Sequence, residues 1–431
     1  MPLPRYSLII ALFAALFCTS IASSVPHALA DAQKAASNEI KLPDGPLRRR
    51  VDFWIKIYTQ YTTSEGLIHD AKYPEVVYEK IDLRVGEEDY SISHKTWRKQ
   101  GQKRVERIKE FYKKTLLSIH KKVERKEALS DAEKRVFELF KDVNEPKKFF
   151  NAAHFKRIRL QLGQKDRFIQ GLYYSGRYLP LMEKIFKERG VPIEVTRLPF
   201  VESSFNLKAR SKVGASGIWQ FMPSTGKLYL KINDTIDERN DPIRATEAAA
   251  QLVMHNYEAL GSWPLAITAY NHGRKGLMRA VRKVGTTDLH EIIESYRSRS
   301  FGFASSNFFS EFLAAYEVEK NAEKYFGKFE RDTVIEFSEF VMSEYVGARD
   351  IATYTRIPMD ILMELNPGLS SAVWEGQRYV PSGYVLRIPP DQKEKFLTRY
   401  NEIPANKKFA SQKTSRTDLT SRKTADSKNS L

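Results

Sequence analysis

The sequence predicts a mainly α-helical protein that ends in a small module of mixed helices and strands. Three observations support this prediction. Apolar residues recur at helical spacing between charged residues from about residue 47 to 190. Helix start and stop signals follow one another between residues 191 and 330. Residues 333–390 have the pattern of a strand, two short helices and a second strand.

Residues 1–30 have the pattern of a secretory signal peptide. Arg5 precedes an apolar stretch, residues 8–18, that is short for a membrane span, and residues 28–30 form an Ala-Leu-Ala cleavage site. We therefore expect an exported protein, and a retained N-terminal anchor is the alternative. Phe17 before the single cysteine, Cys18, argues against lipid attachment. A mature chain without cysteine has no disulfides, so its stability must come from hydrophobic cores.

The formal net charge of +17 favours anionic partners. Export argues against nucleic acid as that partner, and leaves anionic cell-wall polymers and the anionic surface of a membrane. Most of the charged residues are expected to lie on a solvated surface. The expected location is therefore the periplasm, with peripheral membrane association as an option.

The segments before residue 191 are expected to be a linker and a helical region. Residues 31–46 are polar and contain Pro43 and Pro46, which is typical of a linker. In the helical N-terminal region, residues 47–190, the apolar rows are expected to form ordinary core rather than a cofactor site. Val105, Ile108 and Phe111 belong to one such row.

Clear helix boundaries mark residues 191–330. Asp241 before Pro242 predicts an N-cap followed by the first helical residue, and Gly261 predicts the end of that helix. Pro264 is expected to open a shorter helix that ends near Gly273.

The C-terminal module is expected to contain strands at 333–337 and 384–388 and helices at 351–354 and 359–365. The tail, residues 391–431, is basic and poor in apolar residues, so we expect it to be disordered.

Glu202 is the strongest candidate for a catalytic residue. Phe200, Val201 and Phe205 flank it, which predicts partial burial and a raised pKa. A carboxylic acid that stays protonated in such a cleft can protonate the departing oxygen of a glycosidic bond. A single glutamate beside apolar residues is more often a surface position, so the assignment depends on the motifs around it.

Several other residues are candidates for substrate binding. The turn at Gly214–Gly217 allows a close backbone approach, and Gln220 offers an amide to sugar groups. Tyr270 is suited to stacking or to a hydrogen bond near Glu202, and Asn271 to binding an acetamido group. The alternatives are an ordinary turn, a buried amide and a helix cap. Trp219 and Met222 fit a sugar cleft or plain core equally well, and His272 fits a structural role.

These motifs together resemble the lytic transglycosylases that have a goose-type lysozyme fold. The matching residues are Glu202-Ser203, Ser211, Gly214-Ala215, Gly217, Gln220, Met222-Pro223, Thr225 and Ala269-Tyr270-Asn271. The resemblance implies a lysozyme-like domain at residues 191–330 that binds peptidoglycan glycan strands. It implies that Glu202 is the catalytic acid and then the base, and that Ser211, Gly217, Gln220, Met222, Tyr270 and Asn271 bind the substrate.

The implied reaction cleaves the bond between N-acetylmuramic acid and N-acetylglucosamine and leaves a 1,6-anhydro end. The muramyl C6 hydroxyl is then the nucleophile, and an intramolecular nucleophile has a high effective molarity. The segment 301–309 resembles the membrane-bound murein transglycosylase D branch. The fourth motif of the family implies a tyrosine near the acid, and Phe309 stands close to its place, with Tyr316 as a substitute.

The C-terminal module resembles a LysM glycan-binding module through Asn366-Pro367-Gly368-Leu369 and Leu386-Arg387-Ile388-Pro389. A purely structural role is the alternative for this module.

Two other functions of the protein also stay open. A lysozyme-type hydrolase would need a second carboxylate, and a wall-binding scaffold would need none. The candidates for that second carboxylate are Asp234, Asp237, Glu238 and Asp241. No metal motif is present, and the chemistry needs neither metal nor cofactor.

Overall fold

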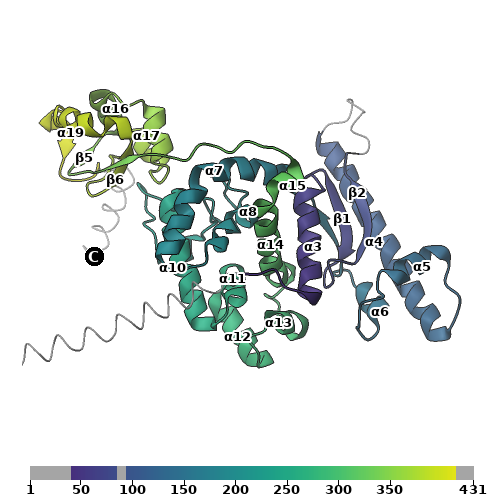
Figure 1. Ribbon diagram of the computed structural model, residues 1–431. Coiled ribbons are helices and arrows are strands. Elements are labelled where there is room, and N and C mark those ends of the chain that lie inside the picture. Colours follow the sequence, from purple (N-terminus) through teal and green to yellow (C-terminus); the bar gives the residue numbers. More distant parts are fainter. Residues whose placement is uncertain (1–39, 85–93, 414–431) are drawn as a thin grey trace, which may run out of the picture.

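The computed structural model describes residues 40–84 and 94–413, so the predicted signal peptide lies outside the described residues (Figure 1). Three hydrophobic cores organise the described chain: a large helical core, a small N-terminal core and the core of the C-terminal module. The mainly α fold class predicted from the sequence is confirmed. None of the described helices combines the length and apolar character that a membrane span requires.

The large core is built by helices that surround α14, and Figure 1 shows them in the centre of the molecule. Pro, Asp and Gly residues set their ends as the sequence predicted. Asp241 caps the helix that begins at Pro242, and Gly261 ends it in the left-handed region, with φ 67°. The elements are α3 (Gly45–Thr59), α7 (Lys165–Glu188), η1 (Ile193–Arg197), α8 (Leu198–Glu202), α9 (Pro223–Gly226), η2 (Glu238–Asn240), α10 (Pro242–Leu260), α11 (Trp263–His272), α12 (Arg274–Val284), α13 (Leu289–Ser295), α14 (Phe303–Lys320) and α15 (Ala322–Phe326).

The boundary of this helical domain differs from the predicted one. α3 and α7, expected in a separate N-terminal region, contribute buried residues to the same core as residues 191–330. α3 lies along α14, and buried Arg50 and Trp54 each donate a hydrogen bond to the Asn307 side chain. Ile40, from the predicted linker, is also buried in this core.

The rest of the N-terminal region contains a small sheet where only helices were expected. Strands β1 (Glu65–Asp70), β2 (Val77–Asp82) and β3 (Ile158–Leu162) form an antiparallel sheet in the order β2-β1-β3. Helices α4 (His94–Arg125), α5 (Asp131–Glu138) and α6 (Lys148–Ala152) complete this part. The central strand β1 is buried on both faces after Glu65, including His69 and Asp70, so it lacks the alternation by which strands are identified.

The C-terminal module has the predicted order of strand, two helices and strand. β4 (Ser338–Val341) pairs antiparallel with β6 (Val385–Ile388), and α16 (Ala348–Thr355) and α17 (Met359–Leu365) lie between them in sequence. The strand predicted at 333–337 is wrong. That segment is extended, but Asp332 and Ile335 donate to carbonyls of α7 instead of a neighbouring strand. The remaining elements are β5 (Tyr345–Val346), α18 (Ser371–Trp374), η3 (Pro390–Gln392), α19 (Lys393–Asn401), η4 (Ala405–Lys407) and β7 (Lys408–Phe409).

The prediction of a disordered tail from residue 391 is wrong as far as residue 409. Phe396 and Tyr400 of α19 and the following Ile403 are buried in the module core, and β7 pairs with β5. The tail is largely polar, but these few apolar residues lie at the spacing of one helix face. Residues 414–431 lie outside the described part of the chain.

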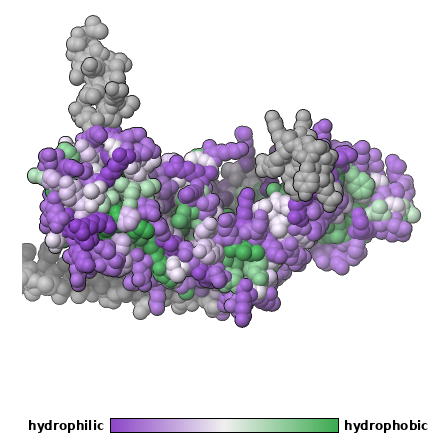
Figure 2. Space-filling model, turned by 90° about the horizontal axis from the view of Figure 1, so that it is seen from above, coloured by the Kyte–Doolittle hydropathy of each residue, from purple (hydrophilic) through white to green (hydrophobic). Residues whose placement is uncertain are grey.

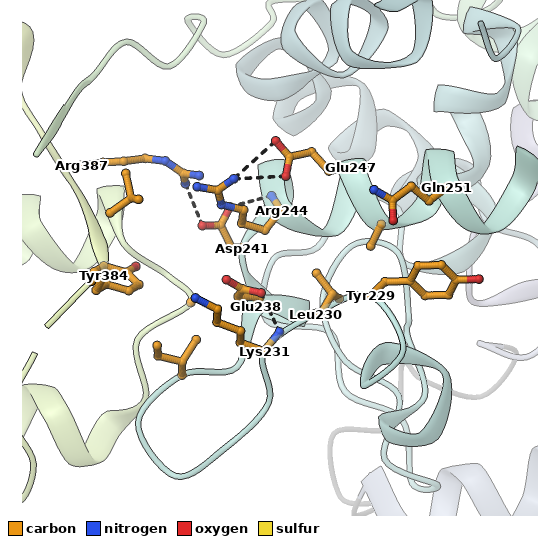
Figure 3. A pocket seen from close by; sticks show the side chains of 15 residues that line it. Tyr229, Leu230, Lys231, Glu238, Asp241, Arg244, Glu247, Gln251, Tyr384 and Arg387 are labelled. Atoms are coloured by element: carbon orange, nitrogen blue, oxygen red, sulfur yellow. Dashed lines mark hydrogen bonds and ion pairs between the residues drawn. The ribbon is translucent and has the colours of Figure 1, made fainter. Parts of the chain in front are cut away.

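The C-terminal module docks on the helical domain through a buried ion pair. Arg387 of β6 donates to Asp241 at 2.8 Å, and both side chains are about 5% exposed (Figure 3). Backbone bonds extend the contact, from Asp237 N to Gly368 O and from Ser370 N to Thr235 O. A pocket of about 300 Å³ lies at this junction, and Figure 3 shows its charged lining. The loop that carries the LysM-like Asn-Pro-Gly sequence is therefore held against the helical domain.

The surface of the molecule is mostly hydrophilic, as its charge predicts. On the face that Figure 2 shows, hydrophobic residues form separate patches between charged and polar ones. The exposed apolar residues with the largest exposed fractions are Val213, Leu228 and Phe155.

Candidate functional site

Glu202 is the last residue of α8, and a tight turn follows it directly. Ser204 and Phe205 both have positive φ, 52° and 55°, a strained conformation for residues with side chains. The strain is held in place by packing, because buried Phe205 contacts Phe200 edge to face and Phe200 stacks on Phe168. The Ser203 hydroxyl donates to the Ile218 carbonyl at 2.8 Å. The predicted apolar flank of Glu202 is thus a rigid aromatic support.

The carboxyl group of Glu202 has the acid–base character that a general acid needs. Burial raises the pKa of Glu202 from 4.5 to about 8. Within the described residues this carboxyl makes no hydrogen bond or ion pair that would stabilise its charge. It therefore carries a proton at neutral pH.

Glu202 lines a pocket of about 530 Å³ together with Gln220. The Gln220 amide donates to the carbonyls of Gly217, at 2.8 Å, and Ala209, at 3.2 Å. These bonds use its nitrogen and leave its oxygen available in the pocket. Gln220 has φ 48°, a further strained position beside the acid. The structure therefore brings these two predicted residues together.

Tyr270 lies near Glu202 and is only partly exposed to solvent. Its hydroxyl donates to the Trp219 carbonyl at 2.8 Å, and its ring packs against Phe221 and Phe308. Burial raises the pKa of Tyr270 well above 10, and the nearby Glu202 adds to this rise. Tyr270 thus holds the loop that carries Gln220, and its hydroxyl remains a neutral donor.

The glycine-rich turn shapes the loop instead of lining the pocket. Gly217 has φ 76°, and a Cβ at this position would lie 1.8 Å from the Arg239 carbonyl oxygen. Arg239 is buried, and its guanidinium donates to the carbonyls of Gly214 and Phe221. The Ser211 hydroxyl accepts from Ala215 N at 2.9 Å. Gly217 and Ser211 therefore position the site from outside the pocket.

The remaining candidates are also set apart from the Glu202 pocket. Asn271 is exposed and accepts a hydrogen bond from Ser305, whose hydroxyl also contacts His272. Met222 is 38% exposed just before α9. Trp219 is fully buried, donates to Thr246 and stacks on Phe186, so it belongs to the core.

The four carboxylates considered as second catalytic acids all have structural partners. Asp237 binds Arg239 through both oxygens, and Asp241 caps α10 and binds Arg387. Asp234 pairs with Arg378 at 2.6 Å, and Glu238 accepts from Lys231 N at 2.6 Å. None of the four lines the Glu202 pocket.

Glu311 of α14 is the carboxylate that the sequence interpretation missed. The pKa of Glu311 is raised to about 8, mainly by burial and also by the charge of nearby Glu202, while Arg159 acts against both effects. Arg159 reaches this region from β3 and lies over the Phe303 ring, 4.1 Å from its centre. The sequence did contain a sign of this buried carboxylate. Glu311 is the single charged residue in a largely apolar run that contains Phe308, Phe309, Phe312 and Leu313.

A tyrosine does lie near the acid, but it comes from α3. Burial raises the pKa of Tyr58 well above 10, and both Glu311 and Glu202 contribute to that rise. Phe309 is buried core beside Phe312. Tyr316, the proposed substitute, lies at a different pocket and contacts Lys320. Tyr316 therefore does not line the Glu202 pocket. Tyr58 lies far from α14 in the sequence, so no motif there indicates it.

Comparisons with known proteins show sequence similarity over the part of the chain that contains Glu202. Residues 182–293 match the family described as "Transglycosylase SLT domain". The chain is 33% identical over 141 residues to the membrane-bound lytic murein transglycosylase D of Escherichia coli strain K12, and equally to that of E. coli O6:H1 strain CFT073. A protein of Alteromonas sp. strain M-1 that is named for tributyltin chloride resistance is 34% identical over 109 residues, which are 25% of this chain and 53% of that protein.

The two E. coli alignments cover 32% of this chain and 30% of each relative, so the chain matches less than a third of their length. The segment that matches the domain family contains Glu202, Gln220 and Tyr270, and it leaves Tyr58, Arg159 and Glu311 outside.

Proposed function

We propose that this chain, whose residues 182–293 match the transglycosylase SLT domain, is a peptidoglycan lytic transglycosylase. The observation that carries the proposal is Glu202, a partly buried carboxyl with a pKa of about 8 in a polar pocket. Glu202 protonates the glycosidic oxygen between N-acetylmuramic acid and N-acetylglucosamine. The resulting carboxylate then takes the proton of the muramyl C6 hydroxyl, which attacks C1 and closes the 1,6-anhydro ring.

The pKa of Glu311 favours this reaction over hydrolysis. A hydrolase of the two-carboxylate type needs its second group ionised, as a base for water or as a nucleophile. Glu311 does not line the Glu202 pocket. Its raised pKa, about 8, also disfavours the ionised form that either role requires. Glu311 and Tyr58 instead keep the surroundings of Glu202 uncharged. Of the other predicted contacts, Gln220 is proposed to bind substrate directly, and Ser211, Gly217 and Tyr270 to position it.

Product analysis tests the proposal. Digestion of purified sacculi is expected to release muropeptides with 1,6-anhydro ends, which lack one water relative to reducing ends. Mass spectrometry before and after borohydride reduction distinguishes the two, because only reducing ends are reduced. Reducing ends would support the lysozyme-type alternative, and no released product would support the scaffold.

The rate is expected to fall as the pH rises through about 8. Glu202 must be protonated to act as an acid, and its pKa is raised, so the active form persists well above pH 4.5 and is lost near pH 8. The measurement is kcat/KM on soluble glycan strands between pH 5 and 10. Because Glu202 and Glu311 interact, the fall of kcat/KM at alkaline pH reports the ionisation of both carboxyls together. In Glu311→Gln the same fall should follow the ionisation of a single group. A fall centred near pH 4.5 would contradict the raised pKa.

The proposed substrate also gives the location and the role of the C-terminal module. Peptidoglycan as substrate, the predicted signal peptide and the membrane-bound relative support an exported, periplasmic enzyme with membrane association as an option. We propose that residues 338–409 form a LysM-like module whose Asn366–Leu369 loop serves docking, because Gly368 and Leu369 contact residues 236–237 of the helical domain.

A further inference from the structure

Three cationic side chains line the Glu202 pocket without a partner. Arg167 extends from α7, and Lys208 and Arg210 lie in the loop after α8. No ion pair or side-chain hydrogen bond of these three residues occurs within residues 40–84 and 94–413. Nearby arginines differ, since Arg197 pairs with Glu183 and Glu319, and Arg239 with Asp237.

The rest of the pocket lining does not neutralise these charges. Among the described residues that line the pocket, Glu202 is the only acidic one, and burial keeps it protonated at neutral pH. The other polar groups are amides and hydroxyls, from Gln164, Gln170, Ser203, Ser204, Asn206 and Gln220. Three positive charges among neutral hydrogen-bonding groups favour a ligand that is both polyhydroxylic and anionic.

We propose that Arg167, Lys208 and Arg210 bind a carboxylate of the glycan strand that occupies the Glu202 pocket. The inference rests on the proposed function, which puts a glycan strand there. A muramyl residue without peptide carries a free lactyl carboxylate, and a muramyl residue with peptide carries the carboxylates of that peptide. An N-acetylglucosamine oligomer carries none. Guanidinium and ammonium groups bind both kinds of carboxylate by charge-assisted hydrogen bonds.

Binding to the full-length Glu202→Gln protein separates these ligands, because the ligand is not consumed. Three soluble probes of equal sugar length are used: peptide-bearing muropeptide fragments, the same fragments stripped of peptide, and neutral N-acetylglucosamine oligomers. Calorimetry measures the affinity of each probe for this background and for a pocket variant. The pocket variant carries Arg167→Gln, Lys208→Gln and Arg210→Gln in the same background. The loss is expected to be about tenfold in affinity for a carboxylate-bearing probe, since exposed ion pairs are individually weak.

A matched variant controls for net charge. Lys187, Lys212 and Lys227 are exposed, lie on the same domain and do not line the pocket, so their replacement by glutamine removes the same charge elsewhere. This control variant is expected to bind all three probes as the background does. The affinity of the pocket variant for the neutral oligomer should also be unchanged.

The outcomes either identify which carboxylate of the glycan strand binds the three cationic residues or overturn the proposal. A loss for the stripped fragment assigns the lactyl carboxylate, and a loss restricted to the peptide-bearing fragment assigns the peptide. An equal loss for the neutral oligomer, an equal loss in the control variant, or no loss at all would overturn the subsite. Anhydro ends are scored separately with wild-type protein, so a chain that binds selectively but releases none refutes the proposed reaction and not the subsite.

Discussion

Replacing Glu202 by glutamine is expected to abolish turnover while the protein stays folded. Glutamine has nearly the same shape but cannot donate the proton, and loss of a general acid costs at least about a hundredfold in rate. The loss should be larger here, because the same carboxyl is proposed to act next as the base. The measurement is muropeptide release from sacculi, and release within a few-fold of wild type would refute the role of Glu202.

The same substitution should raise stability at alkaline pH. The folded protein holds the Glu202 proton up to about pH 8, whereas the unfolded chain loses it near 4.5. Stability is therefore lost as the pH rises between these values, and a neutral glutamine removes that loss. Thermal unfolding should show a gain at pH 8 that is absent at pH 4. Glu258→Gln, at an exposed position on α10, is the control and should change neither rate nor this pH dependence.

Asp241→Asn is expected to destabilise the docked C-terminal module by about 3–5 kcal/mol. Asparagine keeps the oxygen that caps α10, but it leaves the guanidinium of Arg387 buried without its charge partner. In the sequence Asp241 is a predicted N-cap and a candidate second carboxylate, and neither role indicates an ion pair with Arg387. Calorimetry should show a lower transition for the module, and limited proteolysis should cut faster at residues 327–337. An unchanged transition would show that the ion pair does not hold the module.

Two variants separate this mechanism from a general effect of charge. Glu339→Gln removes a half-exposed carboxylate 3.9 Å from the same arginine and should cost less than about 1 kcal/mol. Adding Arg387→Met to Asp241→Asn removes the stranded charge and should recover much of the loss. Failure of this rescue would contradict the unpaired buried charge of Arg387 as the cause of the loss.

Local signals predicted the parts of the fold that depend on neighbours in sequence. Asp241, Pro242 and Gly261 defined α10 because capping involves residues a few positions apart. Glu202 and Gln220 were found for a similar reason, since one short loop brings them to one pocket. The alternating pattern at 333–337 predicted a strand, and this prediction is wrong because the extended segment bonds to α7 instead of to another strand.

The missed features all depend on contacts between distant segments. Glu311, Tyr58 and Arg159 come from α14, α3 and β3, and only the folded chain brings them near Glu202. β1 was missed because burial of both its faces erases the alternation of a surface strand. The turn at Gly217 was interpreted as an approach for ligand, whereas its close neighbour is the backbone of Arg239.

The pairing of α3 with α14 has a consequence for how the chain reaches its native state. Arg50 and Asn307 are 257 residues apart, yet they share a hydrogen bond in the centre of the large core. Contacts of such high sequence separation form late and slow folding, because a long loop must close first. The core cannot be completed until the ribosome has synthesised α14. During synthesis the nascent chain therefore stays incompletely folded, and for the exported enzyme proposed above this is the state that a translocation channel for unfolded polypeptides accepts.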